Sequence, residues 1–233
     1  MFVGRPHALG ARCDCRGAAG VGAVNVSNTL ETIVDNLPRP RQSRSLKTQE
    51  GFIDAGWAIV RRQSWESISV TDIAKRAKRS VGVFYQRFGS KEDFLSVLLH
   101  RWIEASFATT LFDRPWDSAD ALIDGYLTDA FTRIRDDRFL WRAALQRALD
   151  DSRSWEPFRE LAASRRERLA QGIEQLRGRA LSDDERQRLA LALQVFNSMI
   201  NNALLNNPGP LKVEDPTFLP TMLGLFRTVS RLD

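Results

Sequence analysis

Three helix start signals lie close together in one short stretch of this sequence. Ser69, Ser80 and Ser90 each precede a run with helical spacing of apolar residues. A serine in this position accepts a hydrogen bond from a free backbone N–H of the first turn, and Asp72 makes the first signal resemble a capping box with the shorter acid. Because the connection between the first two helices is so tight, they can form only a helix-turn-helix. The predicted helices cover about residues 70–77, 80–87 and 90–110.

Helical patterns also precede and follow this stretch. An apolar stripe that includes Phe52, Trp57 and Val60 predicts a helix from about Ser45 to Gln63. No alternating or β-branched run indicates a strand, so the predicted fold class is all-α: a three-helix helix-turn-helix domain followed by a helical bundle that forms a homodimer. We expect Trp57, Phe84 and Phe88 in the core. The later helices are expected at about 117–135, 138–150, 155–178, 183–206 and 216–231.

Composition and charge narrow the function. The 233 residues are 43% hydrophobic and 27% charged, typical of a globular protein. The formal net charge is +5, but residues 43–90 hold nine basic and four acidic side chains, whereas residues 91–233 hold 20 and 22. A compact basic segment beside a near-neutral remainder indicates contact with a polyanion. A solvated charged helix face remains an equally weighted alternative.

The first 42 residues differ from the rest. They are rich in Gly and Ala and end at Pro38 and Pro40, which predicts a flexible leader; a start codon assigned too early is another interpretation, which N-terminal sequencing would settle. Charged residues interrupt any signal-peptide core, no run reaches the roughly 18 apolar residues of a membrane span, and the only cysteines, Cys13 and Cys15, are too close together to close a useful loop. We expect a cytoplasmic protein.

In a helix-turn-helix, the second helix places its N-terminal residues at base edges in the major groove. The first residues of the third helix are small and suit such an approach, Gln86 one turn later suits adenine, and Tyr85 and Lys91 suit phosphates. Residues at the start of the second helix can also bind phosphate, and two arginines add charge. The predicted DNA-contacting set is Ser69, Thr71, Arg79, Ser80, Val81, Gly82, Val83, Tyr85, Gln86, Arg87 and Lys91.

The runs 69–74, 80–85 and 88–94, preceded by Phe52-Ile53-Asp54-Ala55-Gly56, resemble the TetR/AcrR family of transcriptional regulators over about residues 44–95. The resemblance implies an all-helical homodimer that binds palindromic double-stranded DNA and represses until a small-molecule effector releases it. After the leader that composition predicts (1–42), it implies a DNA-binding domain (43–92) and an effector-binding and dimerisation domain (93–233).

The sequence departs from the family pattern at three positions. Ser64 and Lys78 stand where the family usually has Gly, and Arg79 replaces a small apolar residue. A left-handed turn residue costs a non-Gly side chain roughly 1 kcal/mol, which Lys can bear. Arg79 exchanges a packing side chain for a cation that could reach phosphate or read guanine.

The C-terminal half has a heavy aromatic load that suits an apolar or aromatic effector. Asn197 and Asn201 could face a pocket, but we expect them at a helix edge. Surplus apolar residues on the last two helices indicate a buried partner: Leu191, Val195, Met199 and Ala203 on one, and Phe218, Met222, Leu225, Phe226 and Val229 on the other. The candidate effector-binding residues are Trp102, Tyr126, Phe131, Trp141, Phe196, Asn197 and Asn201.

The sequence lacks the motifs that would indicate an enzyme. No Gly-rich phosphate loop, nucleophile elbow or Cys/His nucleophile arrangement occurs, so we expect no enzyme, no cofactor and no metal site. His100 is expected at a helix edge, and the acid pair Asp136-Asp137 to mark a loop or a helix start. The competing hypothesis is an all-helical binding or scaffold protein whose basic segment contacts an acidic protein or a lipid surface.

Overall fold

The computed structural model describes residues 43–232, and this part of the chain is built from helices with no strand. The predicted all-α class is confirmed, whereas the expected leader, 1–42, lies outside the described residues. Two short 3-10 helices, η1 (Trp65–Ser67) and η2 (Ser152–Trp155), were not predicted. The α-helices are α2 (Ser43–Val60), α3 (Val70–Arg76), α4 (Val81–Phe88), α5 (Lys91–Phe107), α6 (Ala119–Asp136), α7 (Arg138–Asp150), α8 (Glu156–Arg177), α9 (Asp183–Asn206) and α10 (Phe218–Ser230).

The three serine caps form as predicted. Ser69 accepts from the backbone N–H of Asp72, and the Asp72 carboxylate closes a capping box. The hydroxyls of Ser80 and Ser90 accept from the third residue of their helices at 3.3 and 3.0 Å. Capping of this kind is worth about 1 kcal/mol per helix, which is a large share of the stability of short helices such as α3 and α4.

Four phenylalanines form the core of the N-terminal end. Phe52, Phe84, Phe88 and Phe94 are at most 1% exposed, and their ring centroids lie 4.7–5.7 Å apart in tilted and edge-to-face pairs. Gly56 makes room for them, because a Cβ there would lie 2.7 Å from the Phe94 ring. Since Phe94 belongs to α5, this core joins the helix-turn-helix to the first helix of the bundle.

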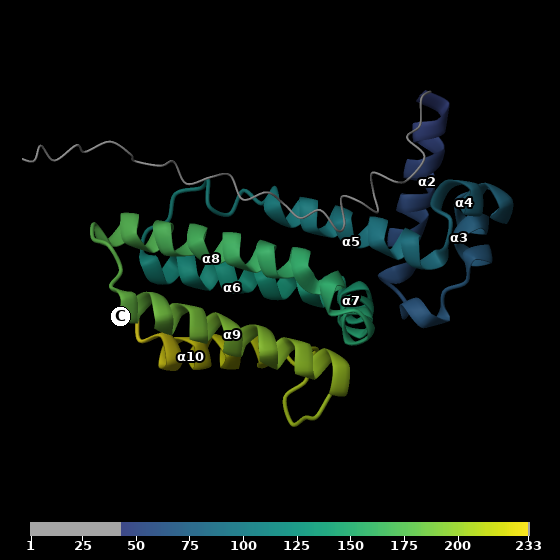
Figure 1. Cartoon of the computed structure of the whole chain (residues 1–233). Coiled ribbons are helices and arrows are strands. Elements are labelled where there is room, and N and C mark those ends of the chain that lie inside the picture. Colours follow the sequence, from purple (N-terminus) through teal and green to yellow (C-terminus); the bar gives the residue numbers. More distant parts are fainter. Residues whose placement is uncertain (1–42, 233) are drawn as a thin grey trace, which may run out of the picture.

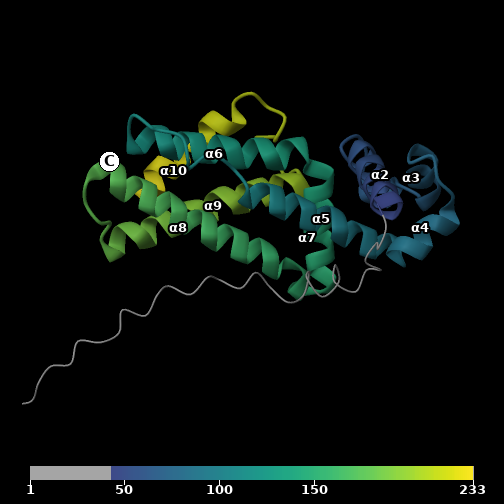
Figure 2. The same ribbon diagram turned by 90° about the horizontal axis from the view of Figure 1, so that it is seen from above.

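The bundle extends from this end in layers (Figures 1 and 2). Helix α5 leaves α2–α4 and runs over α6 and α8, while α9 and α10 cover the opposite side. The short helix α7 lies at the end of the bundle nearest to α2–α4. None of the described helices is long and apolar enough to cross a membrane.

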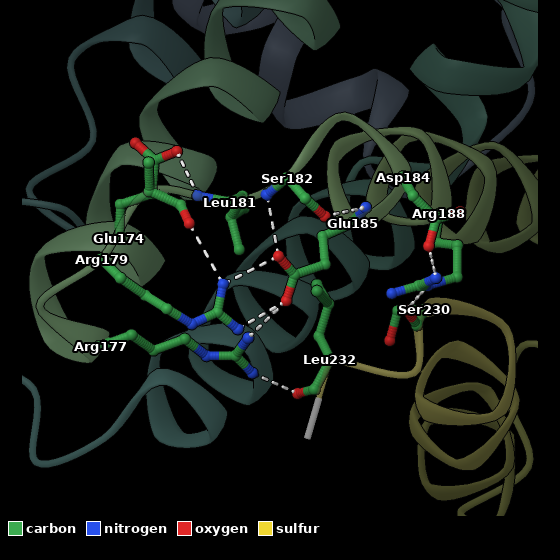
Figure 3. A network of polar contacts seen from close by, with 11 residues as sticks. Glu174, Arg177, Arg179, Leu181, Ser182, Asp184, Glu185, Arg188, Ser230 and Leu232 are labelled. Carbon is green, nitrogen blue, oxygen red and sulfur yellow. Dashed lines mark hydrogen bonds and ion pairs between the residues drawn. The ribbon is translucent and has the colours of Figure 1, made fainter.

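The chain end is fastened to the turn between α8 and α9 by an ionic network (Figure 3). Arg179 pairs with Glu185 at 2.7 Å, and Arg177 donates to the Leu232 carbonyl at 2.6 Å. The Arg179 guanidinium, followed by the backbone N–H of Ser182, holds the pKa of Glu185 well below its usual range. The network therefore joins the end of α8, the start of α9 and the residues that follow α10.

One burial expectation was confirmed only in part, and another was wrong. Trp57 packs against the core but is only half-buried, and Arg61 covers its ring at 5.2 Å from the centroid. On α10, Phe218, Met222 and Phe226 are at most 2% exposed within the single chain. These three side chains are already buried against the chain's own helices, so they cannot form a partner-facing stripe.

Candidate DNA interface and ligand cavity

Helix α4 presents its beginning to solvent. Ser80 and Gly82 are exposed, and Tyr85 one turn later is 49% exposed. Val81 and Val83 are half-buried and pack against the core, so they present only part of their methyl surface. An added Cβ at Gly82 would meet only the Ser80 hydroxyl, at 3.9 Å. A close approach of another molecule to this helix start is therefore sterically open.

The turn between α3 and α4 contains two exposed cations. Lys78 adopts φ +55°, the left-handed conformation that the sequence predicted for this position. Arg79 does not enter the core, because its side chain is exposed and donates to the Lys78 carbonyl at 3.0 Å. Lys78 was not among the predicted contacts. Its position directly before the recognition helix, within the basic segment, is the signal that could have included it.

The start of α3 is exposed, but one of its polar groups is already hydrogen-bonded within the chain. The Ser69 hydroxyl donates to the Asp72 carboxylate at 2.6 Å. This bond, together with the bond from the Ser69 backbone, lowers the pKa of Asp72. Thr71 lies beside it and is exposed. The Ser69 hydroxyl therefore serves the helix cap, whereas its place at the helix start is still that expected of a phosphate contact.

Two of the predicted cations are held by the chain itself. Arg87 is half-buried and donates to the Ser45 hydroxyl of α2. Lys91 donates to the Trp65 carbonyl at 2.9 Å, and its ammonium lies 4.8 Å from the centroid of the Trp65 ring. Gln86 is exposed. The predicted set thus shares one end of the molecule, but its members differ in how freely they can reach a ligand.

A buried carboxylate joins this end to the bundle. Asp137, between α6 and α7, is 8% exposed. It accepts from Arg61 Nε, just after α2, at 2.8 Å and from the Trp102 indole of α5 at 3.1 Å. The sequence predicted that this residue marks a loop or a helix start, and it does directly precede α7, but its buried contacts were not predicted. Its partners are 76 and 35 residues away, so no local pattern could identify it.

Helix α7 has a second bond to the same region. Arg147 donates to the Ser96 hydroxyl at 2.6 Å and to the Glu92 carbonyl at 3.3 Å. Both acceptors lie in the first half of α5, which shares its core with α4. Helix α7 is therefore bonded to α5 close to the helix-turn-helix, in agreement with its place in Figure 1.

Beyond Asp137 lies a cavity of about 180 Å3 between α5, α6, α7, α8 and α9. It brings together five of the seven candidate effector residues, namely Trp102, Tyr126, Trp141, Asn197 and Asn201. The two asparagines, expected at a helix edge, line this cavity, and Asn201 accepts from the Trp141 indole at 2.8 Å.

The other two candidates lie in the core, outside the cavity lining. Phe131 stacks on Phe218 with centroids 5.3 Å apart, and Phe196 is 1% exposed. Trp155 and Phe158, which complete the aromatic lining, were not predicted. Among residues 43–232, no cluster of three or more His, Cys, Asp or Glu side chains could hold a metal ion.

The exposed second helix of a tight helix pair, carried on a basic segment, defines a helix-turn-helix DNA-binding module. Residues 52–98 match the family model of bacterial regulatory proteins, tetR family. This segment of the chain is therefore a helix-turn-helix of the TetR type, as the sequence resemblance indicated.

Individual relatives agree with this assignment. The chain is 44% identical over 54 residues to YwcC, an uncharacterized HTH-type transcriptional regulator of Bacillus subtilis (strain 168). The aligned segment covers 23% of this chain and 24% of YwcC, about a quarter of that relative.

Solved structures share the fold over a larger part of the chain. A Rhodococcus sp. structure assigned to the TetR family covers 78% of this chain and 98% of its own at a TM-score of 0.56 and 15% identity. Salmonella enterica GusR covers 82% and 100% at a TM-score of 0.51 and 16% identity. At these identities, the likeness concerns the fold alone.

Proposed function

We propose that this regulator is a ligand-responsive repressor that binds operator DNA through α4 and releases it when a small molecule enters the bundle cavity. The observation that carries the proposal is the joining of two sites by one buried carboxylate: Arg61 beside the helix-turn-helix and Trp102 in the cavity wall both bind Asp137. The predicted domains, 43–92 and 93–233, are part of this proposal, and so is a cytoplasmic location, where chromosomal DNA lies.

The DNA contacts follow from exposure. The start of α4 enters the major groove with Ser80 and Gly82 nearest to the bases, and Tyr85 donates to a phosphate. Arg79, Lys78 and Thr71 add contacts from the turn and from the start of α3. Arg87 and Lys91 contribute charge while they keep their intramolecular bonds. Phosphate contacts supply affinity that falls with salt, and only the groove residues select sequence.

The working unit in this proposal is a twofold dimer formed by α9 and α10. Met199 on α9 and Leu225 on α10 stay exposed in the single chain, each at 39%. Exposed apolar residues on both of the last two helices suit a self-complementary helical interface. A twofold dimer matches a palindromic operator whose half-sites lie about 34 Å apart or a multiple of that distance.

Coupling between the sites is a shift between two conformations. A ligand that contacts Trp102 and favours one conformation changes the position of Asp137 and, through Arg61, the orientation of the helix-turn-helix. The ligand must distinguish the two conformations by about 1–3 kcal/mol, the usual range of such coupling.

The test is fluorescence anisotropy of the full-length protein on duplexes from its own promoter and on random duplexes of the same length. Preference for promoter DNA at moderate salt, reduced by Tyr85→Phe, supports the proposal. Equal affinity for both duplexes contradicts it. A scaffold that binds an acidic protein or lipid surface would instead keep its partner when Tyr85 is changed.

The dimer has a separate test. Met199→Glu combined with Leu225→Glu places carboxylates in the proposed interface without touching α4. Light scattering is expected to show a monomer with weakened operator affinity. A dimer that survives both changes would exclude this interface.

A further inference from the structure

We propose that the ligand of the bundle cavity is a single-ring aromatic acid: its ring lies against the aromatic wall and its carboxylate faces a cluster of arginines. This inference rests on the proposed ligand response and adds the chemical class of the ligand. Three independent features of the cavity support it: the shape of its wall, the sign of its charge and an unpartnered buried donor.

The wall suits one flat ring. Trp155 and Phe158 stack with centroids 4.5 Å apart, and Trp141 meets Phe158 edge to face at 5.2 Å. Trp102 continues the wall, 5.0 Å from Trp141. The cavity holds about 180 Å3, slightly more than the roughly 150 Å3 of an apolar cavity that binds benzene. The space therefore accommodates a benzene ring with a short substituent rather than a fused ring system.

The charged lining is of one sign. Arg133, Arg159 and Arg165 line the cavity, and no Asp or Glu does so among the described residues. Arg159 pairs with Glu156 outside the cavity. Arg133 and Arg165 share a single carboxylate, that of Asp129, at 3.1 and 2.6 Å. Two guanidinium groups opposite one carboxylate leave a net positive charge beside an apolar wall, and a ligand carboxylate would balance it.

One donor at this position lacks a partner. Arg165 is 6% exposed; its terminal nitrogens donate to the Ser106 carbonyl at 3.3 Å and to Asp129 at 2.6 Å. Within the described part of the chain its Nε–H, although buried, has no acceptor. A buried donor of a charged group is costly to leave unsatisfied. A carboxylate oxygen is the acceptor that fits a guanidinium best.

Tyr126 adds a neutral donor. Burial raises the pKa of its hydroxyl, although the nearby Arg165 acts in the opposite direction, so the group stays protonated at neutral pH. Tyr126, Asn197 and Asn201 also line a groove of about 520 Å3 along α8 and α9. These shared residues place the groove next to the cavity and mark it as the ligand's entrance.

The test compares acids with neutral molecules of the same shape. Isothermal titration of the full-length protein uses benzoate and phenylacetate against benzamide and phenylacetamide. The acids are expected to bind at least about tenfold more tightly, as charge-assisted hydrogen bonds to guanidinium groups require. Equal affinity of acids and amides, or no binding of any of the four, would overturn the inference.

Variants locate the binding site. Arg133→Gln is expected to reduce acid affinity roughly tenfold and to leave amide affinity unchanged, whereas Arg133→Lys recovers part of the loss. Arg142→Gln, an exposed change on α7, is the matched control. Arg165 is left intact because it is only 6% exposed and also donates to the Ser106 carbonyl, so its removal would disturb the core.

A steric pair completes the test. Ala162 lines both the cavity and the groove and is exposed, so Ala162→Trp blocks the entrance without disturbing the core. The control is Ala163→Trp at the adjacent exposed position, and this variant is expected to bind the acids with the affinity of the parent. Acid binding that survives Ala162→Trp and Arg133→Gln would place the acids elsewhere and refute the assignment.

Operator DNA separates this inference from the ligand response itself. If the acids bind in the cavity but do not release DNA, the ligand class stands and the repressor mechanism fails. If only neutral molecules release DNA, the mechanism stands and the ligand class fails.

Discussion

The two ends of this molecule solve the same packing problem differently. At the helix-turn-helix, four phenylalanine rings fill the centre and every charged group lies outside. In the bundle, three tryptophans and a phenylalanine surround a cavity of about 180 Å3, and a buried arginine lies among them. The first arrangement gives a rigid shape that can read a rigid duplex. The second leaves a cavity unfilled and a buried charged group with an unsatisfied donor, and a bound ligand could fill the one and pair with the other.

The difference also separates fixed from adjustable parts. A fully packed core has few alternative arrangements, whereas a cavity with an unsatisfied donor gains free energy when filled. Asp137 lies between the two regions and bonds to both. In the proposed mechanism, a ligand-induced change in the bundle moves the helix-turn-helix as a unit through Asp137.

The largest expected effect tests the rigidity of the first region. Phe84→Ala removes a fully buried ring from the phenylalanine core and is expected to lower the free energy of unfolding by about 3–5 kcal/mol. Urea denaturation followed by circular dichroism measures it. Leu149→Ala, at a position 78% exposed, is the control and should stay within about 0.5 kcal/mol of the parent. A loss below 1 kcal/mol for Phe84→Ala would mean that this core is loosely packed.

The second prediction concerns the surface of the same region. Gly82→Glu places a carboxylate at the start of α4, where an added side chain meets little, and repulsion from phosphates should lower operator affinity about 100-fold. Anisotropy measures the affinity, and thermal unfolding checks that the fold persists. Ala163→Glu changes the net charge equally in the bundle and should retain binding. If Gly82→Glu bound operator DNA with unchanged affinity, the prediction that α4 lies in the major groove would be wrong.

Sequence reasoning succeeded at the first region and only partly at the second, for a physical reason. The caps at Ser69, Ser80 and Ser90 act over three residues, and the Lys78 turn is decided by its own backbone conformation, so each leaves a local pattern. Asp137 and the cavity depend on side chains from five helices. The sequence did indicate Trp102 and Trp141, but it could not show that Phe131 packs on Phe218 while Asn197 reaches the cavity.

The third prediction tests the charge in the second region. Burial raises the pKa of Asp129, but hydrogen bonds from Arg165 and Arg133 outweigh it, so the folded-state pKa lies below the ordinary 3.8. A carboxyl with a lowered pKa stabilises the fold at pH above its unfolded value, and this contribution is lost as the pH falls through the folded value.

Asp129→Asn should therefore cost about 2 kcal/mol at pH 7 and make stability less dependent on pH below 4. Urea titrations at several pH values measure both effects. Asp129→Glu, which keeps the carboxylate, should retain the pH dependence. If the stability of Asp129→Asn still fell steeply below pH 4, groups other than Asp129 would cause that loss.

The fourth prediction concerns the connection between the regions. Asp137→Asn keeps the shape of the side chain, but its single amide oxygen can accept from only one of Arg61 and Trp102, so one of the two bonds is lost. The variant should still bind operator DNA. DNA binding should, however, protect α6 and α7 from hydrogen exchange several-fold less than in the parent, a change that corresponds to the usual coupling of about 1–3 kcal/mol. Asp136→Asn is the matched control, because within residues 43–232 its carboxylate pairs with no cation other than the adjacent Arg135. If DNA binding protected α6 and α7 from hydrogen exchange equally in both variants, Asp137 would not carry the coupling.

The smallest effect returns to the turn that sets the angle of α4. Lys78 holds a left-handed conformation at φ +55°, so Lys78→Gly should stabilise the protein by at most about 1 kcal/mol, since the relief of strain exceeds the entropy that Gly adds to the unfolded chain. Lys75→Gly, in the regular part of α3, should destabilise by a similar amount. Urea midpoints of the two variants thus move in opposite directions if backbone strain dominates. Operator affinity of Lys78→Gly then separates the two roles of this residue: a fall in affinity despite the gained stability would show that its ammonium contacts DNA.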